Sequence, residues 1–331
     1  MSKFSYSVAI RTLGTAGEKY EKLLKSIQKQ TIQPEKIVVV LPEGYNIPEY
    51  QIGTEEFVFC EKGMIIQRFA ALKYIKSDYV LFTDDDIEYA EDYIDKLSKV
   101  LEEGAYACVA GPLTELFPPD ALKYKFASLL GGACVMIHGR KDYYVRILRT
   151  GGWSYNHSIA EHHIYETESI PGANFMIRKD IMQKISFDNE IWAERNGYSA
   201  FEDRIMFYKL IVNRYRIGVV SDAHYTHQDG NTSTKDLRLE PFYAGGFNHY
   251  VFWHRFLYSL SRNPFERFWM RLCIEYYILM GRLYSQCLCR IDRETRKQAQ
   301  ATMQGFRDAK IFVKSKEYLN LPSVYVKGRQ R

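Results

Sequence analysis

The stretch Tyr79-Val80-Leu81-Phe82-Thr83-Asp84-Asp85-Asp86 joins an apolar run to three consecutive carboxylates. The apolar run predicts a buried strand, and the acids come where that strand leaves its sheet. Residues two apart on an extended chain point to the same side, so we expect Asp84 and Asp86 to converge on one ligand while Asp85 points elsewhere. Three adjacent carboxylates repel one another, and a bound cation relieves that repulsion.

The chemistry of this acidic triplet indicates which cation it binds. A hard divalent ion such as Mg²⁺ or Mn²⁺ prefers oxygen ligands and often binds through one or two carboxylates, while the phosphates of a substrate complete its shell. The triplet therefore predicts a metal-bridged diphosphate site. The alternative is a solvated acidic turn that caps a helix beginning near Ala90.

Strand and helix signals alternate on both sides of the triplet. The predicted strands are 7–10, 37–41, 57–59, 79–82, 175–177 and 217–220, and the predicted helices are 20–27, 64–75 and 203–213. This alternation predicts an α/β fold around a mostly parallel sheet, in which ligands bind beyond the carboxyl ends of the strands. The segment 113–170 has weak periodicity and is expected to be partly strand and partly loop, and long helical stretches follow Pro241.

A second acidic pair, Glu202-Asp203, opens the helix predicted over 203–213. Acids are favoured at helix N-termini, so one interpretation of the pair is a helix cap. The chemical interpretation is general-base catalysis, in which one carboxylate accepts the proton of an attacking hydroxyl and contributes about 10²–10⁴-fold.

Two histidines, His224 and His227, follow the strand predicted over 217–220. A neutral imidazole is a suitable further ligand for the ion at the triplet. His227 lies nearer the turn at Gly230 and is the preferred candidate, with His224 as the alternative.

Charge and composition narrow the classes of function. The chain has 331 residues and a net charge of +5. From Asp292 to Arg331 there are ten Lys or Arg residues and four Asp or Glu, which indicates a solvated helix face or a contact with an anionic membrane. No RNP, helix-turn-helix or zinc-finger pattern accompanies this charge, so nucleic acid is not an expected partner.

The cysteines and the apolar segments indicate a compartment. Six cysteines form no paired framework and no C-x-x-C motif, which favours a reducing cytosol. The first residues run into a strand without the apolar stretch of a signal peptide, so a cytoplasmic protein is expected. The most apolar later segment, 272–283, is interrupted by Glu275 and Arg282 and is too short to span a membrane.

Taken in order, these elements resemble glycosyltransferase family 2 of the GT-A fold. The resemblance runs from Ser5 to Ser233 and implies a Rossmann-like nucleotide-binding domain with a mixed, mostly parallel sheet flanked by helices. The C-terminal third resembles only the variable helical extensions of such enzymes. The implied division is a catalytic domain over 1–235, with a nucleotide-sugar-binding half over 1–112 and an acceptor-binding half over 113–235, and a basic helical extension over 236–331. The stretches that carry the resemblance are Val8–Thr12, Ile37–Leu41, Tyr79–Asp86, Ile170–Phe175, Phe201–Asp203 and His227.

The resemblance also implies roles for individual residues. Asp203 is the implied catalytic base, and Glu202 is expected to contact the acceptor. Gly172-Ala173-Asn174 resembles the loop under the donor sugar. The other implied donor-site and metal residues are Arg11 and Thr12 beside the nucleotide, Arg68 at its base or phosphates, Asp84, Asp85 and Asp86 at the diphosphate, and Asp84, Asp86 and His227 at the metal.

Two departures from the family pattern qualify this assignment. Family members often carry an acid directly after the second strand to hold the nucleoside, and here Leu41-Pro42-Glu43 offers Glu43 in a shifted register. The Q-x-x-R-W element of processive members is missing, because Trp253-His254-Arg255 does not reproduce it. Its absence favours transfer of a single sugar.

The expected function is therefore metal-dependent, inverting transfer of one sugar from a nucleoside-diphosphate sugar, with Mg²⁺ or Mn²⁺, to a glycan or lipid-linked acceptor in bacterial surface polysaccharide synthesis. One alternative is a nucleotidyltransferase acting on sugar phosphates. Such enzymes usually carry a glycine-rich, basic phosphate-binding loop near the first strand, and Gly14–Gly17 resembles that loop only weakly. The other is a non-catalytic carbohydrate- or membrane-binding module in which the acidic pairs cap helices. The segment 113–170, with Trp153, His157, His162 and His163, is the expected place where donor and acceptor are selected.

Aromatic residues of the C-terminal region suggest contacts beyond the catalytic domain. Phe252, Trp253, Phe256 and Trp269, together with the basic residues, indicate a peripheral contact with the inner face of the plasma membrane. A helical hairpin packed on the catalytic domain, or a homodimer contact, explains the same aromatics.

Overall fold

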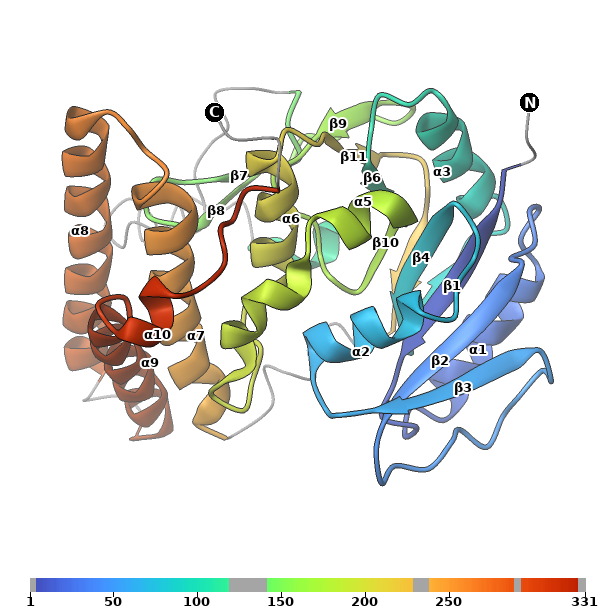
Figure 1. Cartoon of the computed structure of the whole chain (residues 1–331), viewed down its shortest axis with the longest axis horizontal. Helices are drawn as coiled ribbons and strands as arrows, with labels where there is room; N and C mark the ends of the chain where they lie inside the picture. Colours follow the sequence, from blue (N-terminus) through green and yellow to red (C-terminus); the bar gives the residue numbers. More distant parts are fainter. Residues whose placement is uncertain (1–3, 119–141, 229–237, 289–292, 327–331) are drawn as a thin grey trace.

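A mixed sheet flanked by helices forms the centre of the molecule (Figure 1). The computed structural model describes residues 4–118, 142–228, 238–288 and 293–326. Its strands are β1 (Tyr6–Arg11), β2 (Lys36–Pro42), β3 (Glu55–Cys60), β4 (Tyr79–Asp84), β5 (Ile87–Tyr89), β6 (Cys108–Ala110), β7 (Val145–Ile147), β8 (Trp153–Tyr155), β9 (Ile164–Glu166), β10 (Asn174–Arg178), β11 (Ile217–Val220) and β12 (Tyr225–His227).

The main sheet has the order β3-β2-β1-β4-β10-β6-β11-β9. The neighbours β3, β2, β1 and β4 run parallel. β10 is antiparallel to both β4 and β6, β11 is parallel to β6, and β9 is antiparallel to β11. The predicted α/β fold with a mixed, mostly parallel sheet is therefore confirmed.

Helices cover both faces of the sheet. The helices of the described residues are α1 (Glu18–Gln28), α2 (Met64–Leu72), α3 (Tyr93–Glu102), α5 (Lys179–Lys184), α6 (Glu202–Val212), α7 (Glu240–Phe252), α8 (Pro264–Leu288), α9 (Arg293–Phe312) and α10 (Lys316–Leu319), with the short helices η1 (Thr114–Leu116), η2 (Phe187–Glu194) and η3 (Trp253–Tyr258), and α8 to α10 lie away from the sheet (Figure 1). The helices predicted from spacing at 20–27 and 203–213 are α1 and α6.

The β-branched run of β2 explains why the sheet is buried on both faces. Successive side chains of a strand point to opposite sides. Val39 packs in one hydrophobic cluster with Leu23 of α1 and Leu97 of α3. Val38 belongs to the cluster on the other face, with Ile65 of α2. Two helical layers therefore enclose this strand, as an unbroken apolar run predicts.

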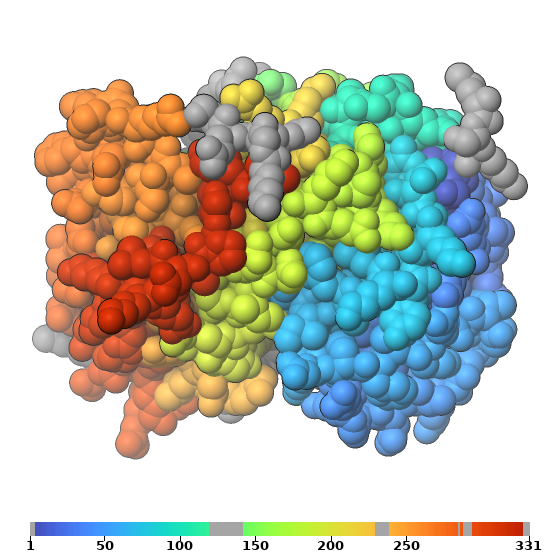
Figure 2. Space-filling model, viewed as in Figure 1, coloured from blue at the N-terminus to red at the C-terminus, as the bar shows by residue number. Residues whose placement is uncertain are grey.

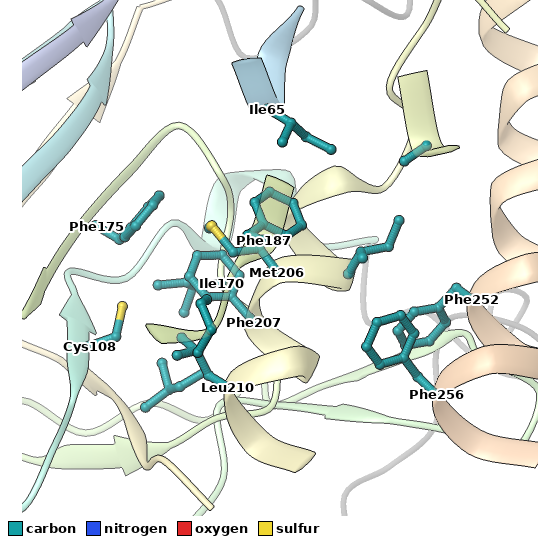
Figure 3. Close-up of a cluster of buried hydrophobic side chains, with 14 of the residues drawn as sticks. Ile65, Cys108, Ile170, Phe175, Phe187, Met206, Phe207, Leu210, Phe252 and Phe256 are labelled. Atoms are coloured by element: carbon teal, nitrogen blue, oxygen red, sulfur yellow. The ribbon is translucent and has the colours of Figure 1, made fainter. Parts of the chain in front are cut away.

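The C-terminal helices share the larger of these clusters with the sheet. Phe175 of β10, Phe207 of α6 and Phe252 at the end of α7 all belong to it, and Figure 3 shows these rings with Phe256 of η3. In the space-filling view the segments after residue 240 lie directly against the middle of the chain (Figure 2). The predicted helical character after Pro241 is confirmed, and its core is continuous with that of the sheet.

Two local expectations are wrong. The acidic triplet does not cap a helix near Ala90, because β5 follows it and pairs with β12, and α3 begins only at Tyr93. The helix predicted over 64–75 ends at Leu72, although Ile75 remains buried in the turn that follows. The apolar periodicity therefore continues beyond the last helical turn.

The aromatics expected to touch a membrane are mostly buried. Phe252, Trp253 and Phe256 have 0%, 2% and 1% of their surface exposed, whereas Trp269 has 46%. Three of these four side chains pack in the core and are unavailable to a lipid surface. No helix within the described ranges is long and apolar enough to cross a membrane.

Candidate active site

The site forms where β1 and β4 end side by side. Their register pairs Arg11 with Asp84, and the Arg11 guanidinium donates to Asp84 Oδ1 at 2.6 Å. The next residue, Thr12, donates its hydroxyl hydrogen to Asp85. The residues predicted beside the nucleotide are therefore brought into contact with the triplet, at the carboxyl edge of the parallel strands.

Burial changes the acidity of the triplet. Desolvation raises the pKa of Asp84, although Arg11 acts against this shift. Desolvation likewise raises the pKa of Asp85 to about 6, with smaller contributions from its two acidic neighbours. Partly buried carboxylates with raised pKa values favour a bound cation, because the cation restores the ionised form.

A two-stranded ribbon brings a histidine to the third acid. β5 follows the triplet and pairs antiparallel with β12, with Ile87 opposite His227. His227 Nε2 then lies 3.1 Å from Asp86 Oδ1. The alternative candidate, His224, is exposed, and no described contact joins its side chain to the triplet. The structure thus places His227, and not His224, beside the triplet.

The residues present fit a divalent ion without forming a complete cage. Within the described residues, no three His, Cys, Asp or Glu side chains are grouped closely enough to hold a metal alone. Asp86 and His227 supply a carboxylate oxygen and an imidazole nitrogen, both of which are ligands for ions such as Mn²⁺. Magnesium-type sites commonly use few protein ligands and leave the remaining positions to phosphate and water. The donor set is consistent with such an open site.

Glu202 lies behind the triplet at the start of α6. Its side chain and that of Arg68 are each only 3% exposed and form an ion pair. Arg11 reaches the other Glu202 oxygen at 3.5 Å, and Arg68 donates to the carbonyl of Gly172 at 2.7 Å. Arg68 is therefore a buried residue that connects α2 to α6 and to the 172–174 loop. Its position on a predicted helix did not indicate this burial.

Asp203 stands next to this loop. Desolvation raises its pKa to about 6, and the charge of Glu202 adds to the shift. Its Oδ1 accepts a hydrogen bond from the backbone N–H of Arg204 at 2.7 Å. A side chain at Gly172 would place its Cβ 2.9 Å from the Cβ of Asp203. The glycine allows the loop to approach the predicted base at van der Waals distance.

An unusual backbone conformation sets the direction of the acidic pair. Phe201, just before Glu202, has φ of +62°, a left-handed conformation that is rare for a bulky residue. Its ring packs edge-on against Trp153 at 5.2 Å, and the guanidinium of Arg204 lies 4.2 Å from its centroid. These contacts hold the turn from which α6 starts.

An aromatic cavity of about 140 Å³ opens beside Asp203. Sequence reasoning named Trp153 but missed its neighbours Phe117 and Tyr155. Trp153 and Tyr155 are two apart on β8, and this spacing was the available signal that both point to one side. The lining residues are Leu116, Phe117, Val145, Trp153, Tyr155, Ser169, Ile170, Pro171 and Asp203.

Several predicted residues lie at the site without pointing into it. Asn174 is fully buried, and its side chain accepts a hydrogen bond from Tyr93 at 2.8 Å. The carbonyl of Ala173 accepts from the N–H of Asp84 at 2.8 Å. Glu43 is exposed at the end of β2, near Cys60, whose pKa is raised by desolvation and then by the charge of Glu43. Ala173 therefore supports the backbone of the triplet, Asn174 is bonded into the interior, and Glu43 lies at the same edge of the sheet.

Part of the chain matches a known protein family. Residues 57–185 match the family model "Glycosyl transferase family 2". This segment includes the acidic triplet, Gly172 and the strands β4 and β10. No curated protein sequence matches the chain significantly.

Solved structures with this fold are distant in sequence. A crystal structure of GalNAc-T7 with UDP, GalNAc and Mn²⁺ is 13% identical, with a TM-score of 0.54 over 97% of this chain, which spans 59% of that structure's chain. Residues 1–349 of S. aureus TarS in complex with UDP-GlcNAc are 15% identical, with a TM-score of 0.48, over 92% of this chain and 81% of that one. Residues 57–185 thus resemble glycosyl transferase family 2, and the arrangement of the sheet shows that the chain has the GT-A fold.

Proposed function

We propose that this protein transfers one sugar from a nucleoside-diphosphate sugar to a hydroxyl of an acceptor, with inversion at the anomeric carbon. The observation that carries the proposal is the arrangement of Asp203 beside Gly172, with the acidic triplet and Arg11 at the adjoining strand ends. A base and a cation-binding diphosphate site then flank the same loop, as a displacement reaction requires.

Asp203 acts as the general base. Above pH about 6 its carboxylate is ionised and accepts the proton of the acceptor hydroxyl as that oxygen attacks the anomeric carbon. The bond between this carbon and the diphosphate oxygen breaks, and its electron pair leaves with the nucleoside diphosphate. Burial makes the carboxylate a stronger base than a solvated aspartate, which favours proton transfer near neutral pH.

The triplet and Arg11 hold the leaving group. Arg11 forms ion pairs with Asp84 and Glu202. Its guanidinium lies at the edge of the sheet where the diphosphate would bind. Asp86 and His227 would hold Mn²⁺ or Mg²⁺, and the bound ion would supply positive charge for the departing diphosphate. Stabilising charge that develops in the transition state lowers the barrier more than it tightens ground-state binding.

The cavity beside Asp203 receives the acceptor. Trp153, Tyr155 and Phe117 give it aromatic walls, and the apolar face of a sugar ring packs well on such surfaces. This lining supports a glycan or lipid-linked saccharide as the acceptor. We place the reaction in the cytoplasm, as a step of surface polysaccharide assembly that adds a single sugar.

The proposal is tested by incubating the purified protein with Mn²⁺, a panel of UDP-sugars and a mixture of saccharide acceptors. The fold shared with a structure that holds UDP and Mn²⁺ makes UDP-sugars the first donors to try. Slow release of UDP without acceptor, and faster release with one, is the expected result. Release of pyrophosphate from a nucleoside triphosphate and a sugar phosphate indicates the nucleotidyltransferase alternative. Binding of saccharides with no turnover of any donor indicates the non-catalytic module.

A further inference from the structure

A continuous apolar face runs along the outside of α8. Its seven members recur at spacings of three and four residues, which puts them on one side of the helix. Seven of the sixteen large hydrophobic side chains exposed in the described residues belong to this one helix, whereas the other nine are scattered. The α8 face consists of Phe265, Phe268, Trp269, Leu272, Tyr276, Leu279 and Leu283, which are 71%, 58%, 46%, 45%, 39%, 52% and 44% exposed.

The packing of α8 explains why this face is left outside. Ile274 and Ile278, on the opposite side of the helix, are 0% and 2% exposed and belong to the shared core. Gly281 leaves room for Met303 of α9, because a Cβ at this position would lie only 3.0 Å from the Met303 Cε atom. The inner side of α8 therefore packs on α9 and the core. The helix lies at the outer edge of the molecule, away from β1 to β3 (Figure 1).

Positive charge borders the α8 face. Both carboxylates of the helix are neutralised by other elements, since Glu266 pairs with Arg149 at 2.9 Å and Glu275 with Lys310 at 2.7 Å. The remaining charged side chains of α8 are the arginines at 267, 271 and 282. The first two lie over the ring of Tyr258 at 4.8 and 5.3 Å. The border thus carries five cationic groups and two carboxylates.

We propose that the α8 face lies on an anionic lipid bilayer, with the helix parallel to the membrane surface. An apolar stripe rich in Phe, Trp and Leu beside an arginine flank has the composition of helices that bind at the bilayer interface. Trp269 and Tyr276 belong to the residue types enriched where acyl chains meet headgroups. Arg271 and Arg282 lie on the same flank of the stripe, where they meet lipid phosphates.

A second copy of the chain fits this face less well. In an antiparallel pair of identical helices, matching flanks meet, so the arginine flank of one copy would lie against that of the other. Like charges brought together in this way oppose association. The core positions of helix pairs also favour Leu, Ile and Val, whereas four of the seven members here are aromatic.

Vesicle cosedimentation of the full-length protein tests the proposal without any sugar donor, so its outcome is independent of the transfer reaction. We expect binding to vesicles of phosphatidylcholine with phosphatidylglycerol, little binding to phosphatidylcholine alone, and weakening by salt. Leu272→Glu with Leu279→Glu should abolish binding. The control Ile311→Glu changes a side chain that is 69% exposed on α9, outside the α8 face, and should bind like the wild type. Unaltered circular dichroism and unfolding temperature would show that each variant folds.

Two further measurements test the role of the arginines and the insertion of Trp269 into the bilayer separately. Replacing Arg271 and Arg282 by Gln should weaken binding to the anionic vesicles about 25-fold, about fivefold for each arginine, since a basic residue near such a surface contributes about 1 kcal/mol. Tryptophan emission should shift to the blue on binding, and Trp269→Phe should remove that shift. Equal binding to neutral and anionic vesicles would overturn the proposal. So would a dimer that Leu272→Glu dissociates, together with no vesicle binding, which would assign the face to a second copy.

Discussion

At the scale of the residue, burial changes the acidity of Asp203, the base that we propose. Its pKa is raised to about 6, so the base form is lost as the pH falls below that value. We expect kcat/KM to rise with pH through about 6 and then to level off. Asp85 has a similarly raised pKa, and donor affinity measured over the same pH range separates the two. A pH-independent kcat/KM between 5 and 8 would contradict Asp203 as the base.

Removing the charge of the same side chain gives a second test. Asp203→Asn keeps the size of the side chain but cannot accept the acceptor's proton, and we expect turnover to fall about 10²–10⁴-fold. Donor binding, measured by calorimetry with UDP and Mn²⁺, should stay within a few-fold of wild type. Wild-type turnover by this variant would remove Asp203 from the mechanism.

Gly172 is a residue whose lack of a side chain is required. Its Cβ would lie 2.9 Å from that of Asp203, 3.1 Å from the Arg68 guanidinium and 3.3 Å from a Glu202 oxygen. Because Gly172→Ala forces these groups apart, we expect at least a tenfold loss of kcat, with an overpacking cost of about 1–3 kcal/mol. Steady-state kinetics and urea unfolding measure the two effects. Gly197→Ala cannot serve as the matched control for a glycine-to-alanine change, because Gly197 has a φ of +75°, at which alanine is strained.

At the scale of the element, the β5–β12 ribbon determines which histidine lies beside Asp86. His227→Ala removes the imidazole beside Asp86, and we expect a higher Mn²⁺ concentration for half-maximal UDP binding. The matched control is His224→Ala, which changes an exposed side chain three residues away. Equal metal dependence in both variants would rule out His227 as a ligand.

The packing of α7 on α9 depends on two glycines in contact with the facing backbone. A Cβ at Gly246 would meet the carbonyl oxygen of Thr302 at 2.1 Å, and one at Gly305 would meet that of Tyr243 at 2.1 Å. Gly246→Ala must push the helices apart, and we expect a loss of about 1–3 kcal/mol in the free energy of unfolding. Gly245→Ala, whose Cβ would lie 3.8 Å from the Phe201 ring, should be neutral or stabilising by up to about 1 kcal/mol. Urea unfolding of this adjacent pair tests the contact.

At the scale of the whole molecule, the C-terminal helices and the part of the chain that holds the sheet are joined by buried charge as well as by the shared core. Glu190 of η2 pairs with Lys209 of α6 at 2.8 Å and with Arg255 of η3 at 2.8 Å. Arg255 also donates to the carbonyl of Pro322. Removing one member of such a buried group leaves an uncompensated charge. The extension therefore completes the interior of the molecule.

This continuity predicts the behaviour of a fragment cut at the expected domain boundary. The fragment 1–235 loses Phe252, against which the ring of Tyr208 packs, and Arg255, one of the two cations paired with the buried Glu190. We expect it to aggregate or to unfold without a cooperative transition, as measured by scanning calorimetry. A chain ending at Val326 keeps the hydrogen bond from that residue to Asn213 and should unfold like the full chain. A soluble, cooperative 1–235 fragment would show that the two parts fold separately.

The sequence by itself determined the features that depend on near neighbours. The apolar run of β4, its acidic end and the start of α6 at Glu202 were all predicted, because strand and helix periods are set by adjacent residues. The preference for His227 over His224 also agrees with the position that the structure gives each residue. The order of these motifs along the chain was enough to indicate the family.

Only the tertiary structure decided what meets across the fold. Arg68 and Glu202 are separated by 134 positions, and no local pattern indicates that they form a buried pair. The aromatic cavity beside Asp203 likewise gathers Phe117, Trp153 and Ile170 from separate segments. The C-terminal aromatics had three interpretations until packing buried Trp253 and left the α8 face outside. Periodicity shows that a helix has an apolar side, but only the packing of the whole chain determines which apolar side is covered.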